Sequence, residues 1–219
     1  MPDAITHSEL PLFPLGTVLF PGGLLPLRIF EVRYLDMISK CHKNGTPFGV
    51  VSLTQGSEVR RPSTEPTGNG FASEAFHEVG TLATIAEYSM PQPGLMVIRC
   101  TGTERFKVQS SHQLKHGLWV AEASKLAQDM PVKVPPDLRN ASDALGKLIH
   151  TLQDRAVPAE QMPLLQPYQL DDCAWVANRW SELLPIPVAL KQQLMELDNP
   201  LVRLELVNDI LDRSGIAAD

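Results

Sequence analysis

The sequence of 219 residues predicts an α+β protein in which strands and helices occupy different parts of the chain. Before about residue 130, apolar residues come in short runs with β-branched members; after it, they recur at helical spacing. Three prolines, Pro131, Pro135 and Pro136, mark the change. We therefore expect a β-rich domain at residues 1–128 and a helical domain at residues 129–219.

The chain from Leu10 to Leu27 carries no charged residue, which raises the question of a membrane span. Four prolines and three glycines interrupt this stretch and disfavour a continuous helix. Acidic rather than basic residues precede it, unlike a signal peptide. We predict two short strands, residues 10–13 and 24–30, with a turn between them, and no membrane association.

A helix is predicted next, at residues 31–42, with Val32, Leu35, Ile38 and Cys41 as its buried stripe. The apolar run at residues 48–53 predicts a strand. Residues 54–75 are rich in Ser, Thr, Gly, Pro and charge, so we expect a long loop that is disordered or functional.

Four more strands are predicted in series and separated by turn signals: residues 78–88, 95–100, 105–109 and 118–123. Short strands with regular turns are typical of an antiparallel meander or barrel.

The sequence of the second domain predicts three or four packed helices. Residues 136–155 carry a leucine-rich stripe, and Asp171 or Asp172 is suited to cap the following helix. Residues 187–197 form a short helical segment, and Asn199-Pro200 has the pattern of a cap followed by proline at the first helical position.

Charge and cysteine content limit the partners. Residues 1–128 hold 11 acidic and 11 basic side chains, so the net charge of -6 lies in residues 129–219. Without a basic stripe, nucleic acid is not an expected partner. Three widely spaced cysteines do not form a disulfide framework, and the expected location is the cytoplasm.

Catalytic and cofactor motifs are missing from the sequence. It contains no P-loop, no G-x-S-x-G elbow and no S-x-x-K pattern, and we expect no cofactor. His112 and His116, with Cys100 upstream, are too few for a zinc site, so no metal is expected either. The interpretation is a protein without enzymatic activity.

Three segments, in order, resemble the N-terminal domain of Lon proteases. The first is Leu10-Pro11-Leu12-Phe13-Pro14-Leu15-Gly16, continued by Val18–Gly22 and Leu25–Tyr34. The second comprises Val79–Ile85 and Gly102–Val108, and the third is Lys191–Glu196 followed by Arg203-Leu204. The resemblance spans nearly the whole chain.

The resemblance implies a PUA-like β pseudo-barrel with one or two helices, followed by a helical bundle. It also implies a module that binds protein substrates in full-length Lon proteases, where ATPase and protease parts follow. Because this sequence has no P-loop and no Ser-Lys dyad, we do not expect proteolysis by it.

The leading hypothesis is therefore a non-catalytic module that binds unfolded or extended protein segments, or one specific partner protein. Apolar runs make Phe13, Phe20, Phe30 and Tyr34 the candidate peptide contacts. Glu31, Arg33 and Arg105 are candidates for structural ion pairs or for a polar pocket. Such a pocket would support the alternative, small-molecule binding or an unrecognised enzyme activity in the β domain. RNA binding, by analogy with PUA-like folds, is a third hypothesis.

Overall fold

The computed structural model describes residues 6–58, 73–158 and 161–216, and the chain divides into two compact units. The units comprise residues 1–126 and 127–219, a division two residues before the one expected from the sequence. Most of the loop expected at residues 54–75 lies outside the described residues.

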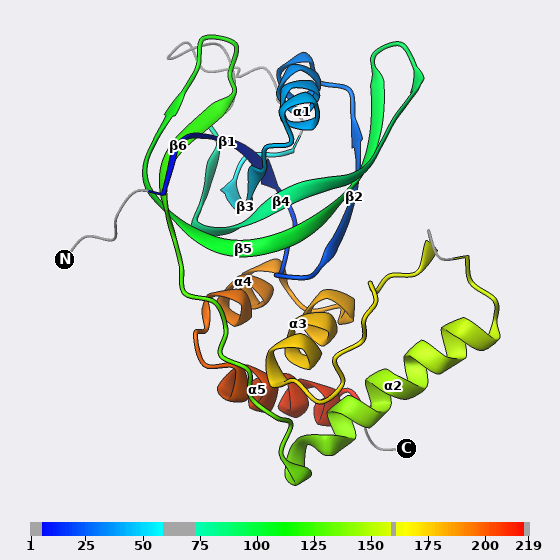
Figure 1. Ribbon diagram of the computed structural model, residues 1–219. Coiled ribbons are helices and arrows are strands. Elements are labelled where there is room, and N and C mark those ends of the chain that lie inside the picture. The colour runs from blue at the N-terminus through cyan, green and yellow to red at the C-terminus, as the bar shows by residue number, and fades with distance from the viewer. Residues whose placement is uncertain (1–5, 59–72, 159–160, 217–219) are drawn as a thin grey trace. The chain divides into compact units, whose positions relative to one another are not determined.

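The first unit is a small barrel with one helix (Figure 1). Its elements are β1 (His7–Leu15), β2 (Leu24–Ile29), α1 (Val32–Asn44), β3 (Phe48–Gln55), β4 (Ala75–Gln92), β5 (Leu95–Gln113) and β6 (Trp119–Lys125). The strand order is β2-β5-β4-β3-β1-β6, and β5 also pairs with β6. The second pairing closes five strands into a barrel, and β2 is attached to the outside of that ring through β5.

The α+β fold is confirmed, but the sheet is mixed rather than purely antiparallel. β1 and β3 run parallel, with Leu12 opposite Gly49, whereas the other pairings are antiparallel. Parallel neighbours need a long crossover connection. β2 and α1 supply it, because both lie between β1 and β3 in the chain.

The strands predicted at residues 95–100 and 105–109 are one continuous strand, β5. The prediction of a turn between these two segments was therefore wrong. Gly102 instead allows a close approach, because a Cβ there would lie 2.2 Å from the carbonyl oxygen of Phe20. Register shifts between β4 and β5 bend this long pair of strands. One part of the pair belongs to the barrel, and in another part β5 pairs with β2.

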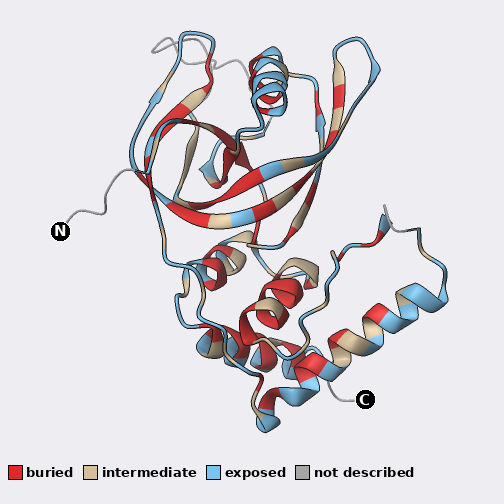
Figure 2. Ribbon diagram, in the orientation of Figure 1, coloured by how far each residue is buried: buried red, intermediate tan, exposed pale blue. Residues whose placement is uncertain are grey.

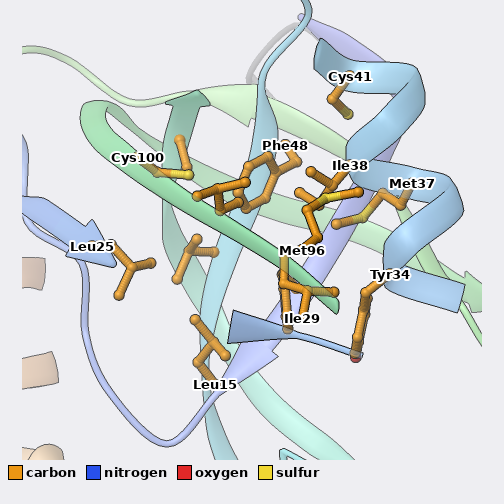
Figure 3. Packing of buried hydrophobic residues seen from close by; sticks show 14 of the residues in the cluster. Leu15, Leu25, Ile29, Tyr34, Met37, Ile38, Cys41, Phe48, Met96 and Cys100 are labelled. Carbon is orange, nitrogen blue, oxygen red and sulfur yellow. The ribbon is translucent and has the colours of Figure 1, made fainter. Parts of the chain in front are cut away.

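Two apolar clusters make the core of this unit. One fills the barrel around Phe106, where Gly49 and Gly80 leave room for the ring. The other lies under α1 (Figure 3). The buried face of α1 includes Tyr34, Met37, Ile38 and Cys41, and the expected Val32 is 72% exposed. A spacing of three residues drifts around a helix with 3.6 residues per turn, so four residues at that spacing cannot all remain on one face.

The second unit is helical. It contains the 3₁₀ turn η1 (Pro136–Leu138) and the helices α2 (Arg139–Asp154), α3 (Cys173–Leu183), α4 (Val188–Glu196) and α5 (Pro200–Arg213). Asp172 caps α3 by accepting from the Trp175 N–H at 2.8 Å, and Asn199 caps α5. Figure 2 shows α3 buried along most of its length. Arg203, which is 1% exposed, donates to both carboxylate oxygens of Asp129 at 2.6 and 3.1 Å.

Candidate functional site

A cavity of about 290 Å³ opens beside β2 in the first unit. Its walls come from the end of β1, the second half of β2, the start of α1 and one residue after β3. The lining residues are Phe13, Leu15, Pro26, Leu27, Arg28, Ile29, Phe30, Glu31, Tyr34 and Glu58. The site is thus largely apolar, with charged groups at a few positions, as ligand pockets commonly are.

Two stacked rings anchor the cavity. Phe13 from β1 and Tyr34 from α1 lie with ring centroids 4.0 Å apart and an interplanar angle of 17°. They are 6% and 3% exposed, respectively, and belong to the cluster under α1. Figure 3 shows Tyr34 with Ile29 and Leu15, two further lining residues, at the end of that cluster away from Cys41. This part of the wall is therefore made of core side chains.

Phe30 has a different environment from these rings. It directly follows β2 and is 56% exposed, although it is a large apolar side chain. A half-exposed aromatic ring beside an apolar cavity is suited to contact a partner, because covering it removes apolar surface from water. Phe30 therefore forms an exposed rim above the buried part of the wall.

A buried arginine, Arg33, contacts two residues that line the cavity. The Nε of Arg33 donates to Glu31 at 3.0 Å, and its Nη groups donate to Glu74 at 3.0 and 3.3 Å and to the Gly117 carbonyl at 2.8 Å. The indole N–H of Trp119 donates to the same Glu74 carboxylate at 2.8 Å. The guanidinium also lies 4.5 Å from the centroid of the Tyr34 ring. Arg33 thus holds two lining residues, Glu31 and Tyr34.

The charge state of Arg33 follows from these contacts. Burial lowers the pKa of Arg33, but the hydrogen bond to Glu74 and the nearby negative charges outweigh burial and raise it above its ordinary value. Arg33 therefore remains a cation throughout the range in which proteins are folded. Its donors are used within the protein, which makes its role structural.

The sequence-predicted site residues fall into two groups. Phe13, Phe30, Tyr34 and Glu31 meet at the cavity. Phe20 is fully buried and does not line it, so we leave Phe20 out of the binding surface. Arg105 also lies elsewhere, in β5 opposite Thr81. Glu31, Arg33 and Arg105 therefore do not converge on this cavity as a polar pocket would require.

Some lining residues had no part in the sequence-based candidates. Pro26 and Arg28 precede Phe30 at spacings of two, and all three are exposed, which is the alternation of a strand with one outward face. That alternation could have identified them from the sequence. No sequence signal marked Glu58, because it lies in a polar segment. Only the structure shows its carboxylate accepting a hydrogen bond from the Gly16 N–H at 2.7 Å.

No cysteine or histidine of the described residues lines this cavity. Cys41, Cys100 and Cys173 are free and buried, and burial raises the pKa of Cys100 to about 12. Such a thiol stays protonated and is a poor nucleophile. Within residues 6–58, 73–158 and 161–216, no group of three or more His, Cys, Asp and Glu side chains is placed to hold a metal ion. The helices in these ranges are also too short or too polar to cross a membrane.

Known proteins resemble this chain over most of its length. It is 27% identical over 212 residues to the Lon protease of Anaeromyxobacter dehalogenans (strain 2CP-C) and 22% identical over 219 residues to the Lon protease of Flavobacterium johnsoniae (strain UW101). The alignments cover 94% and 92% of this chain but 23% and 25% of those proteins. The chain thus spans about a quarter of the length of the curated relatives it matches.

Solved structures agree with the fold. The crystal structure of a Lon N-terminal domain protein from Xanthomonas campestris matches with a TM-score of 0.68 and 30% identity, over 92% of this chain and 97% of that one. The N-terminal domain of Mycobacterium avium complex Lon protease matches with a TM-score of 0.55 over 97% of this chain and 99% of that one, and at 15% identity it supports the fold alone. The family model described as the ATP-dependent protease La (LON) substrate-binding domain matches residues 9–213, and the chain belongs to that family.

Proposed function

We propose that this chain is a non-catalytic recognition module that binds unfolded or extended protein segments through exposed apolar side chains. Membership of a substrate-binding domain family supports recognition of proteins. The observation that carries the proposal is the cavity beside β2, where the exposed ring of Phe30 adjoins the buried stack of Phe13 and Tyr34. An apolar side chain of a partner can enter there, and several of its sides then lose contact with water.

The energetics of such a site favour weak binding. Burying one large apolar side chain contributes roughly 1.5–3 kcal/mol. A micromolar complex requires about 8 kcal/mol, so one side chain in this cavity cannot supply it alone. We therefore expect several contacts along an extended segment, and low selectivity among apolar side chains.

Two further features belong to this proposal. We infer that the protein works in a reducing compartment, the cytoplasm, because its three cysteines are all free. We also infer that its partners are proteins and not nucleic acids or membranes, because the unit that contains the cavity has equal numbers of acidic and basic residues up to residue 128.

Small-molecule binding or enzyme activity in the β domain is less well supported. That alternative needs convergent polar groups in an open pocket. Here Glu31 pairs with the buried Arg33, whose Nη groups donate to Glu74 and to the Gly117 carbonyl. The side chains of Glu31 and Arg33 are therefore occupied by contacts within the protein.

Titration of a labelled, permanently unfolded polypeptide, followed by fluorescence anisotropy, tests the proposed function. We expect saturable binding to the unfolded form and none to its native form. Phe30→Ala should weaken binding roughly tenfold, the equivalent of about 1.4 kcal/mol of lost apolar contact. Val32→Ala is the matched control, because Val32 is 72% exposed but does not line the cavity. No binding, or equal loss in both variants, would contradict the proposal.

A further inference from the structure

β2 presents an unpaired edge at the cavity. Among the described strands, β2 pairs only with β5 and stands at the end of the strand order. Leu27 and Ile29 point to one face of β2, and Pro26, Arg28 and Phe30 point to the other, yet all five line the cavity. A cavity that runs along the edge of a strand meets both of its faces, and the other edge of β2 is covered by β5. The cavity therefore extends along the open edge of β2.

The register with β5 shows which backbone groups face that edge. The Gly102 N–H donates to the Gly23 carbonyl at 2.9 Å, and the same pairing continues as Leu25 with Cys100 and Leu27 with Ile98. In an antiparallel ladder, hydrogen-bonded and non-hydrogen-bonded pairs alternate. The odd-numbered residues of β2 thus bond to β5. The backbone N–H and C=O of Arg28 face away from β5, toward the cavity.

Pro26 lies in the same phase as Arg28 and has no N–H to offer at the edge. Proline is tolerated in sheets where its nitrogen faces outward on an edge strand. It also protects the edge against uncontrolled pairing with other chains. The edge therefore offers a short pairing site centred on Arg28, not a long template.

We propose that a bound polypeptide adds to β2 as an extra strand, with hydrogen bonds to the backbone of Arg28 and alternate side chains directed into the cavity. This inference rests on the proposed function and specifies its mode. Backbone pairing makes recognition independent of exact sequence, whereas the cavity selects for an apolar side chain at one position. This combination is suited to a module that accepts many unfolded chains.

Charge favours one kind of segment. The cavity lining carries Glu31, Glu58 and Arg28. Glu31 is paired with Arg33, and Glu58 accepts from the neutral N–H of Gly16. Three carboxylates and two guanidiniums, counting Glu74 with Arg33, leave the lining and this pair with an excess of negative charge. We expect an apolar segment with a basic flank to bind more tightly than one with an acidic flank.

The decisive probe is a ten-residue peptide that alternates leucine and threonine and has a lysine at each end, measured by fluorescence anisotropy. Two further versions carry N-methyl groups on alternate residues: one on the odd-numbered residues of the peptide and the other on the even-numbered residues. Methylation of the residues whose N–H groups face β2 should reduce affinity at least tenfold. Methylation of the other residues should leave affinity within twofold. Equal binding of all three versions would overturn strand addition but leave the proposed function intact. No binding of the unmethylated peptide would overturn both.

Variants of the protein test the same edge from the other side. Arg28→Pro removes the N–H that faces the cavity and preserves the pairing of Leu27 with β5. Arg28→Ala removes the same side chain but keeps the N–H, and is the matched control. We expect Arg28→Pro to lose roughly fivefold or more in affinity relative to Arg28→Ala, which corresponds to about one net hydrogen bond. Equal affinities would contradict the proposal. A dimer in sedimentation that Arg28→Pro dissociates would assign the edge to a second copy, and would also overturn it.

Discussion

At the scale of single residues, Glu74 connects distant parts of the first unit. Its carboxylate accepts from Arg33 at the start of α1 and from Trp119 in β6. The Glu74 and Arg33 side chains are 6% and 3% exposed, so this pair is removed from most solvent screening. The sequence marked Arg33 as a candidate for an ion pair but gave no sign of Glu74 as its partner, because a pairing over 41 residues depends on the fold.

Glu74→Gln should destabilise the first unit by about 3 kcal/mol, because it leaves the buried cation of Arg33 partly uncompensated. Glu87→Gln is the matched control: Glu87 also pairs with an arginine, Arg99 at 2.8 Å, but its side chain is 57% exposed. That change should cost less than about 1 kcal/mol. Urea unfolding followed by circular dichroism measures both, and equal losses would contradict a buried structural role for Glu74.

Cys100 makes stability depend on pH at the alkaline end. Burial, followed by the charge of Cys41, raises its pKa from 9.0 to about 12. Above pH 9 the unfolded chain loses a proton that the folded chain keeps, so this contribution is complete below pH 9 and falls as pH rises toward 12. At pH 10 the loss is about 1.4 kcal/mol. Urea unfolding at pH 8 and pH 10 should show a smaller fall in Cys100→Ala, and identical falls would contradict this account.

At the scale of elements, local signals predicted the helices of the second unit well. Asp172 and Asn199 cap α3 and α5, as their positions before apolar helical runs indicated. The barrel strands were located, but their lengths and pairings were not. Gly102 resembles a turn residue in the sequence, whereas in the fold it admits the backbone of Phe20. Close approach between segments 82 residues apart leaves no local pattern.

Gly102→Ala should destabilise the barrel by about 2 kcal/mol, because the new methyl would lie 2.2 Å from a backbone oxygen that cannot move aside. Gly146→Ala in α2 should have the opposite sign. A Cβ there meets only the Cδ1 of Leu170 at 3.4 Å, and helix propensity favours alanine by up to about 1 kcal/mol. Hydrogen exchange of peptides from β5 and α2 measures each effect in its own unit, and protection changes of the same sign would be the contrary result.

At the scale of the whole molecule, the sequence indicated the order of β-rich and helical parts and the family, but only part of the candidate site. Aromatic residues in apolar runs were good candidates for the wall, and Phe13, Phe30 and Tyr34 do meet there. Phe20 is buried like Phe13 and Tyr34 but does not line the cavity, and which buried ring borders a cavity depends on how the segments pack in the fold. The parallel pairing of β1 and β3 brings the end of β1 to the cavity, and no residue pattern within β1 encodes that pairing.

The most direct test of the central claim is photo-crosslinking to a labelled unfolded polypeptide. A photoreactive phenylalanine analogue is placed at position 30 or, as a control, at position 90, where Met90 is comparably exposed in β4 but does not line the cavity. We predict that the polypeptide crosslinks at position 30 and not at position 90. Equal crosslinking at both positions, or none at position 30 while anisotropy still reports binding, would contradict the assignment of this cavity as the binding site.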